Sequence, residues 1–538
     1  MNSRLAGRLQ TLAGAAVLIS VVTLVSRVLG FARWMAQASW VGTGGIAQPY
    51  AVANLLPNIL FEVVAGGALA GAVIPLLVGA LHKGDEAGLR RAASALMTWA
   101  LIVLIPLAAL LTIFAPQVIS LTSELHSAQL NAKAVFFLRV FAVQIPLYGV
   151  GVVSGGILQA HKRFLWPALA PLFSSLVVIV TYCLFGILAD GNQANVAALT
   201  ANSIEVLAWG TTAGVAAMVL TMVGPVVRLK LRLRPTLTFP KGMGRRALSL
   251  AFAGIGALLA QQLTMLLVVK VSGPGLFGTP ETFNLFQYAQ AIYVLPYAVL
   301  VVPLATSMFP RISALATQRD YAGFAAMSSS MTRIVILISA LGAALLVAAS
   351  GPLEDFFSAF TAGSVDGMAG AVAWAAPGLV GYSLILLCSR ILYSRDKGRE
   401  AVIATAAGWL VAAAGTALPF VPFIHVAPAD ILALVSGAQA VGMTVAGVLL
   451  ILALWRTGGR DCVSGVARTV VVALSAAILA SGVGFGVAHV LPSAHSRLVV
   501  AVGNGILAAL AATAVAIAVV FVLDRATFMQ LRNLRVGR

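Results

Sequence analysis

Charged residues are scarce in this chain, because Asp, Glu, Lys and Arg together make up only 9% of its 538 residues. Soluble domains carry about 25%, so the scarcity excludes an ordinary water-soluble enzyme. Hydrophobic residues make up 60% of the chain. Because each helical membrane crossing needs about 20 mostly apolar residues, the composition predicts an all-helical, polytopic membrane protein.

Acidic residues and cysteines are also few. The chain has 16 Asp and Glu against 34 Lys and Arg, which gives a net charge of +18. No basic block stands apart from the apolar runs, so we expect no nucleic-acid partner. Cys183, Cys388 and Cys462 lie far apart without C-x-x-C spacing. They indicate neither a disulfide framework nor a metal site.

Catalytic motifs are missing from the sequence. It contains no phosphate-binding G-x-x-x-x-G-K-[ST] loop, no H-E-x-x-H motif and no paired carboxylates within an apolar run. We therefore expect a transporter rather than an enzyme, without a cofactor or a metal ion.

Long apolar runs fill the chain from end to end, and charged or Gly/Pro-rich segments separate them. Each run predicts one transmembrane helix, which makes about fourteen. The runs span residues 10–32, 49–80, 92–115, 134–160, 165–188, 203–227, 247–272, 283–309, 334–351, 368–389, 401–423, 429–455, 469–491 and 498–523.

Lys and Arg gather in alternate connections between these runs, as the positive-inside rule requires of a correct helix count. The largest group has seven basic residues between Arg228 and Arg246. This pattern predicts that both termini are cytoplasmic. A secretory signal cleaved near Ala36 is the alternative for the first run, but Ser26 and Arg27 interrupt that run before the cleavage site.

Short matches at similar offsets suggest an internal repeat, which is common in transporter folds. The fourth run and the tenth share a tyrosine, an Ile-Leu pair and a lysine, and the second and eighth share Leu-Pro. The matching residues are Tyr148, Ile157-Leu158 and Lys162 against Tyr382, Ile391-Leu392 and Lys397, and Leu56-Pro57 against Leu295-Pro296. We predict two pseudo-symmetric six-helix lobes, residues 1–240 with a basic linker and 241–455, followed by two additional helices in 456–538.

Polar residues inside the predicted spans are candidates for function, because a charge near the bilayer centre costs about 2.5 to 3.5 kcal/mol. The candidates for substrate binding are Arg27, Arg33, Asn58, Glu62, Arg139, Gln287 and Gln290. An arginine-rich, hydrated cavity suits an anionic substrate, since guanidinium groups form forked hydrogen bonds to phosphate oxygens.

Glycine and proline within the spans predict where the helices bend. Arg27 and Arg33 lie about 120° apart on a regular helix, so both face one cavity only if Gly30 bends the chain. Pro57 and Pro296 each remove a backbone donor and predict kinks.

The same polar residues also have a purely structural interpretation. Glu62 could form an ion pair with Arg27 or Arg139, and Arg33 could reach the membrane interface. The glutamines could hold helices together.

Several strings resemble those of the MurJ (MviN) family of lipid II flippases within the multidrug/oligosaccharidyl-lipid/polysaccharide exporter superfamily. They are Ser26-Arg27-Val28-Leu29-Gly30-Phe31-Ala32-Arg33, then Leu56-Pro57-Asn58, Gly67-Ala68 and Ile74-Pro75, then Leu295-Pro296 and Phe309-Pro310-Arg311-Ile312-Ser313. The resemblance implies fourteen helices in two lobes plus a terminal pair, in the bacterial cytoplasmic membrane.

The resemblance also implies an activity. A MurJ protein moves lipid II to the outer leaflet, with first-helix arginines, here Arg27 and Arg33, on its pyrophosphate and the last two helices along its polyprenyl tail. Arg139 aligns with a basic position in the family's fourth helix. Cell-wall synthesis proteins are expected as partners.

Departures from the family leave the cargo open. Trp34 stands where members often have an acidic residue, and Phe61 and Glu62 stand where many have two arginines. Gln290 and Ala291 replace an Asp-Arg pair. Export of another polyprenyl-linked saccharide, cation-coupled drug export and a non-transporting scaffold therefore remain alternatives.

Overall fold

The computed structural model describes residues 12–63, 73, 76–77, 85–123, 125, 127–239, 255–492 and 498–525. Within these residues all regular structure is helical and no strand is present, which confirms the all-helical class. Ten of the described helices are long and apolar enough to cross a membrane, and an eleventh crossing arises if the bent pair Met368–Ala375 and Gly378–Tyr393 is one span.

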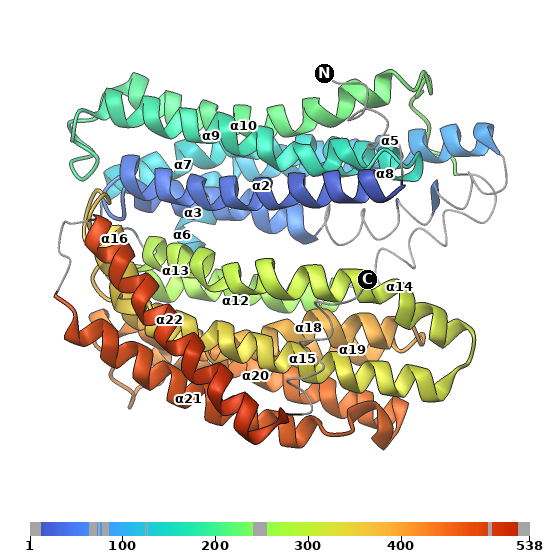
Figure 1. Ribbon diagram of the computed structural model, residues 1–538. Helices are drawn as coiled ribbons and strands as arrows, with labels where there is room; N and C mark the ends of the chain where they lie inside the picture. The colour runs from blue at the N-terminus through green and yellow to red at the C-terminus, as the bar shows by residue number, and fades with distance from the viewer. Residues whose placement is uncertain are drawn as a thin grey trace, which may run out of the picture. The chain divides into compact units, whose positions relative to one another are not determined.

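The chain divides into two compact units, Met1–Leu258 and Leu259–Arg538. The lobe boundary predicted at residue 240 lies outside the described residues, as do Gly67-Ala68 and Ile74-Pro75. Unit 1 contains α2 (Leu12–Trp40), α3 (Ala47–Leu60), α5 (Glu86–Ile113), α6 (Ala115–Thr122), α7 (Ala128–Ala142), α8 (Gln144–Ala160), α9 (Leu165–Ala189) and α10 (Ala201–Val227). In this unit α9 packs between α2 and α10 (Figure 1).

Unit 2 contains the remaining helices, and α12 spans the boundary between the units. They are α12 (Ile255–Ser272), α13 (Thr282–Pro296), the π-helix η2 (Tyr297–Val301), α14 (Val302–Thr317), α15 (Tyr321–Ala348), α16 (Ser350–Ser358), α17 (Met368–Ala375), α18 (Gly378–Tyr393), α19 (Gly398–Thr416), α20 (Ile431–Gly458), α21 (Val466–Val490) and α22 (Leu498–Leu523), with the 3-10 turns η3 (Leu418–Phe420), η4 (Pro428–Asp430) and η5 (Arg460–Val463).

Each of the fourteen apolar runs contains helix, but fourteen crossings stay a prediction. α3 has 14 residues and passes directly into the π turn at 61–63, and residues 64–72 lie outside the described part of the chain. Three of the runs predicted as single helices are interrupted next to a proline. Proline explains each break, since Pro146, Pro296 and Pro377 lack the N–H that would continue the helical ladder.

One helix in each unit begins with the same kind of aspartate cap, which the short sequence matches did not include. Asp85 caps α5 by accepting from the Gly88 N–H at 2.7 Å, and Asp320 caps α15 by accepting from the Gly323 N–H at 2.9 Å. Each helix has 28 residues. A Cβ at Gly88 would lie 2.0 Å from the Asp85 carboxylate, so the Asp-x-x-Gly spacing suits this cap.

Small residues join the last two helices to α15. Ala344 and Ala348 of α15 pack against Ala480 of α21 and Ala512 of α22. A Cβ on Gly484 would lie 2.4 Å from that of Ala348. Such side chains let helices approach closely in lipid, where packing drives association.

An ion pair fixes one end of the same three helices. Arg333 of α15 lies 3.5 Å from Asp524, just after α22, and its Nε donates to Thr469 of α21 at 3.0 Å. Arg468 donates to the carbonyl of Leu523 at 2.9 Å. Asp524 is 2% exposed, so its charge depends on these partners.

We expect Asp524→Ala to lower the free energy of unfolding by roughly 2 to 4 kcal/mol, because it leaves Arg333 without its carboxylate. The double variant Arg333→Met/Asp524→Leu should lose much less, since neither charge is then buried alone. Thermal unfolding in detergent measures both. Equal losses in the two variants would contradict this account.

Candidate functional site

The predicted site residues fall in both units. Arg27 and Arg33 lie on α2, Asn58 on α3, Glu62 in the π turn at 61–63 that follows α3, and Arg139 on α7, all in unit 1. Gln287 and Gln290 lie on α13 in unit 2.

A hydrogen-bond network around Tyr148 joins three helices of unit 1. The Tyr148 hydroxyl of α8 donates to Asn58 Oδ1 at 3.1 Å or to Gln144 Oε1 at 3.3 Å. Gln144 is fully buried, and its Nε2 donates to Thr212 of α10 at 3.0 Å. Asn58 donates in turn to the carbonyl of Asn54. This network satisfies amide groups that could not stay unpaired among apolar helices.

A second network lies around Tyr50 of α3. Its hydroxyl is 2.9 Å from that of Tyr182 and 3.1 Å from Thr211 Oγ1. Tyr182 donates to Gln37 Oε1 at 3.2 Å. Phe137 meets the Tyr50 ring edge-on at 5.6 Å. The network thereby links α2, α3, α9 and α10 in a polar layer that is enclosed by aromatic rings.

Arg33 lies near the Tyr50 network. Its side chain is half-buried, and it stands one turn before Gln37 on the same face of α2. The guanidinium carbon also lies 5.8 Å from the centre of the Trp34 ring. A cation beside several hydroxyl and amide groups can hold an anion through forked, charge-assisted hydrogen bonds.

Arg27 has a different environment. It is exposed on α2, which runs through Gly30 as one helix from Leu12 to Trp40. No atom lies within 4 Å of a Cβ built on Gly30. The angular separation of Arg27 and Arg33 on a regular helix explains why one is exposed and the other half-buried.

The π turn after α3 separates Asn58 from Glu62. Asn58 is half-buried, whereas Glu62 is exposed. Phe61, between them, packs on Tyr148 with the rings tilted by 40° and their centres 4.4 Å apart. Pro57 lies inside α3 one turn earlier, and a π turn there accommodates the lost ladder hydrogen bond.

Arg139 contacts another helix. It is exposed in the last turn of α7, and its Nε donates to the Thr112 carbonyl near the end of α5 at 3.4 Å. A cation at this position satisfies a terminal helix carbonyl. The hydrogen bond joins Arg139 to α5 and not to the Tyr50 or Tyr148 network.

In unit 2 the two predicted glutamines differ. Gln290 exchanges amide hydrogen bonds with Gln439 of α20, which supports the interpretation that it holds helices together. Gln287 is half-buried on α13. Pro296 ends α13 and the π-helix η2 follows directly, as a π turn also follows Pro57.

Tyr382 of α18 packs on the chain around this π-helix. Its ring centre lies 4.8 Å from that of Tyr297 and 5.9 Å from that of Tyr293. Tyr148 contacts Asn58 and Phe61 in the corresponding part of unit 1. Each unit therefore packs a tyrosine against a proline-induced π turn.

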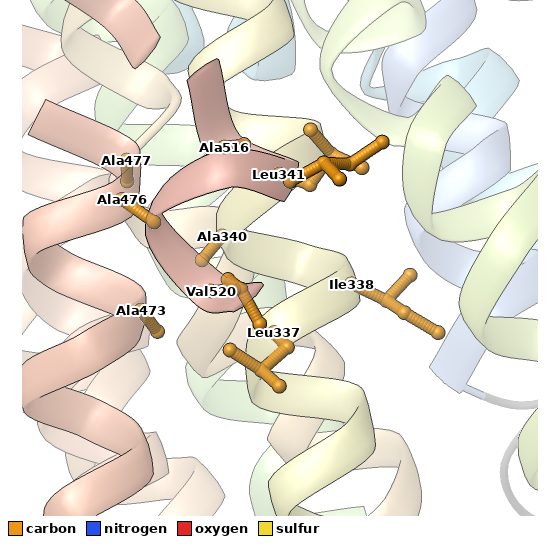
Figure 2. Close-up of a pocket in the computed structure, with 10 residues that line it drawn as sticks. Leu337, Ile338, Ala340, Leu341, Ala473, Ala476, Ala477, Ala516 and Val520 are labelled. Carbon is orange, nitrogen blue, oxygen red and sulfur yellow. The ribbon is translucent and has the colours of Figure 1, made fainter. Parts of the chain in front are cut away.

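Two apolar hollows lie in unit 2. The larger has a volume of about 530 Å³ between α15, α18, α20 and α21, and its lining includes Ala340, Gly381, Val448 and Ala477. The smaller, of about 100 Å³, lies between α15, α21 and α22. Figure 2 shows Leu337 and Leu341 of α15 and Val520 of α22 around it. Ala340 and Ala477 line both hollows, so they form neighbouring parts of one apolar region.

No group of three or more His, Cys, Asp or Glu that could hold a metal ion occurs among the described residues. Cys183, Cys388 and Cys462 are free thiols.

Comparison with known proteins identifies the family. The family model described as "Lipid II flippase MurJ" matches residues 37–503. The chain belongs to the MurJ family. The matched range begins after Arg27 and Arg33, so the roles of these two residues remain predictions.

Curated MurJ relatives cover most of the chain. The lipid II flippase MurJ of Burkholderia cenocepacia is 26% identical, over 87% of this chain and 88% of its own length. A probable lipid II flippase MurJ of Thermotoga maritima is also 26% identical, over 72% of this chain and 75% of its own length.

Solved structures agree with the MurJ fold. A lipid II flippase MurJ in an inward closed conformation matches with a TM-score of 0.69 at 18% identity, over 93% of this chain and 98% of its own. An inward-facing multidrug resistance MATE transporter of the MOP superfamily matches with a TM-score of 0.67 at 14% identity, over 83% of this chain and 98% of its own. The fold is thus shared by lipid and drug exporters.

The buried residues that join the helices of this MurJ protein were not among the predicted site residues. Gln37, Tyr50, Gln144 and Tyr182 form most of the two networks. Tyr148 served only as a marker of the repeat. The sequence could have indicated the glutamines, because a glutamine side chain inside an apolar run needs a hydrogen-bond partner.

We expect Gln144→Leu to lower the free energy of unfolding by about 1 to 3 kcal/mol, because the change removes hydrogen bonds from two buried groups, Tyr148 of α8 and Thr212 of α10. Gln129→Leu makes the same change on the exposed surface of α7 and should have little effect. Thermal unfolding of both variants in detergent tests this, and similar melting temperatures would argue against a stabilising network.

Proposed function

We propose that this chain translocates lipid II, the lipid-linked peptidoglycan precursor, from the inner to the outer leaflet of the bacterial cytoplasmic membrane. One observation supports this proposal above the others. In a chain of the lipid II flippase MurJ family, Arg33 is half-buried on α2, one turn before the Gln37 that accepts a hydrogen bond from Tyr182 in the Tyr50 network. A guanidinium in partly dry surroundings binds a diphosphate more strongly than one in water.

Substrate contacts follow from this position. Arg33 holds the pyrophosphate, with Asn58 and the Tyr148 hydroxyl offering further hydrogen bonds. Arg27, Glu62 and Arg139 are exposed and meet the headgroup at other stages of its passage. Gln287 and Gln290 contribute amide groups from the second lobe.

The polyprenyl tail occupies the apolar region of unit 2. A volume of about 530 Å³ falls within the range of sites for small ligands, and its lining is almost entirely aliphatic. The tail can therefore stay in apolar surroundings while the headgroup crosses, which avoids the cost of exposing it to water.

Alternating access supplies the movement. Two lobes, residues 1–240 and 241–455, rock against each other, and the two helices in 456–538 accompany the second. The π turns after Pro57 and Pro296 are the bending points, because helices deform where their hydrogen-bond ladder is already broken. Gly30 allows α2 to bend in the same movement.

The membrane arrangement consists of fourteen crossings with both termini in the cytoplasm, as the distribution of Lys and Arg supports. The protein works as a transporter, without a catalytic step or a cofactor. Enzymes of cell-wall synthesis supply and remove its substrate and are its expected partners.

Cation-coupled drug export is the second candidate, because the fold also matches that of a MATE transporter. Glu62 would then be the coupling carboxylate. Arg33 is half-buried in unit 1, whereas Glu62 is exposed, which favours an anionic substrate.

Arg33→Gln should lower the rate of lipid II translocation at least about tenfold, because it removes a charge-assisted contact to phosphate. The assay measures how much lipid II reaches the outer leaflet of proteoliposomes. Arg399→Gln, at an exposed position in the first turn of α19, is the matched control. Unchanged translocation in Arg33→Gln would contradict the pyrophosphate role, and drug efflux by the wild type would support the second candidate.

Ala477→Phe should slow translocation severalfold without unfolding the protein, because the added ring fills part of both hollows. Ala518→Phe adds the same ring to an exposed position of α22 and should leave the rate unchanged. Depletion followed by complementation, with measurement of the lipid-linked precursor left on the inner leaflet, compares the two. A fully active Ala477→Phe variant would exclude a tail in these hollows.

A further inference from the structure

The chain that follows α10 carries an alternating pattern of basic and apolar residues that the transport proposal does not use. Residues 228–234 read Arg-Leu-Lys-Leu-Arg-Leu-Arg. The leucines are half-buried and belong to the side chains packed against the core of unit 1. The four basic residues, Arg228, Lys230, Arg232 and Arg234, are exposed. We call these four the basic strip.

Hydrogen bonds to α5 fix the segment that includes the strip. The Arg234 N–H donates to Ser94 Oγ and the Thr236 N–H donates to Thr98 Oγ1, each at 3.1 Å. The Trp99 indole N–H donates to the Leu237 carbonyl, also at 3.1 Å. Ser94 and Thr98 are one turn apart and so share a face of α5. The segment is thus an ordered part of unit 1 that is held against α5.

The backbone conformation of the segment directs its basic side chains away from the protein. Lys230 has φ +54° and Arg232 has φ +46°, a left-handed conformation that few residues other than glycine adopt. Both residues stand between leucines that pack against the core. The local conformation keeps leucines on the protein and charges on the outside.

The segment lies where α5 enters the apolar part of its span. The first turns of α5 carry Glu86, Arg90 and Arg91, and the helix is then apolar to Ile113. Ser94 is within one turn of that change. Trp99 is 43% exposed, and tryptophan with a bonded indole is typical of a membrane interface. These positions put the strip at the level of the lipid headgroups.

Charge at this end of unit 1 is strongly one-sided. Arg90 and Arg91 in the first turns of α5 are exposed, as are Lys162 and Arg163 in the connection after α8, against Asp85 and Glu86. Among the residues that the structure describes, no carboxylate forms an ion pair with any member of the basic strip. Four exposed cations on one segment attract anions.

We propose that the basic strip binds the phosphate groups of anionic phospholipids in the leaflet where α5 begins and α10 ends. Exposed apolar side chains flank it, since Val227 is 69% and Leu237 is 55% exposed. A bound anion must therefore sit at a bilayer surface, with acyl chains against these residues, which favours a phospholipid over a soluble partner. The contact anchors unit 1 to that leaflet.

The test uses the full chain in nanodiscs of phosphatidylcholine with a minority of phosphatidylglycerol. Native mass spectrometry counts the phosphatidylglycerol that stays bound after release from the disc. The variant Arg228→Gln/Lys230→Gln/Arg232→Gln/Arg234→Gln should retain at least about tenfold less, given the contribution of each basic residue near an anionic surface. Arg311→Gln/Lys397→Gln/Arg399→Gln/Arg456→Gln removes four exposed charges from unit 2 and should retain the wild-type amount.

A charge-preserving variant and a competition with lipid II test whether charge and phospholipid account for the retention. Arg228→Lys/Arg232→Lys/Arg234→Lys preserves the charge and should keep the lipid, while thermal unfolding checks that each variant is folded. Equal retention by the two quadruple variants would overturn the proposal. Added lipid II should not displace the phosphatidylglycerol, and displacement would show instead that the strip binds the diphosphate of the transported lipid. Because these arms measure retention and not translocation, they are independent of the flippase proposal.

Discussion

The need to pair every polar group inside an apolar helix bundle governs unit 1. Gln144 has no exposure at all, and in lipid an unpaired amide costs several kcal/mol. Its hydrogen bonds to Tyr148 and Thr212 therefore determine how α8 faces α10. Tyr50 does the same for α3, α9 and α10. Arg33 lies one turn before Gln37 on α2, so a half-buried cation proposed to bind substrate stands next to the groups that hold these helices together.

In unit 2, close packing of small residues and an ion pair hold α15, α21 and α22 together. Alanine and glycine let α15, α21 and α22 pack closely in one region, and the pairing of Arg333 with Asp524 fixes their ends. The apolar hollows open beside this close packing, where aliphatic side chains replace the hydrogen-bonding groups of unit 1. Hydrogen-bonded polar networks therefore join the helices of unit 1, and apolar hollows lie between helices of unit 2.

Shared details of the two units support descent from one repeated bundle. Asp85 and Asp320 cap helices of equal length, and Pro57 and Pro296 each precede a π turn with a tyrosine packed against it. The aspartate caps and the proline-associated π turns need a particular backbone geometry, and few residue types are compatible with it. These features therefore occur in both units although most side chains differ. Each unit thus has one π turn of the same kind after a proline.

Composition and the apolar runs determined that this chain is a helical membrane protein, because burial in lipid requires apolar runs whatever the tertiary packing. Short strings around Arg27 and Pro57 indicated its family. Only the tertiary structure decided which polar residues meet. Arg139 contacts the Thr112 carbonyl of α5, and Gln290 pairs with Gln439 across 149 positions of sequence. Such pairings depend on how helices distant in the sequence rotate and pack against one another, and no local pattern records that rotation.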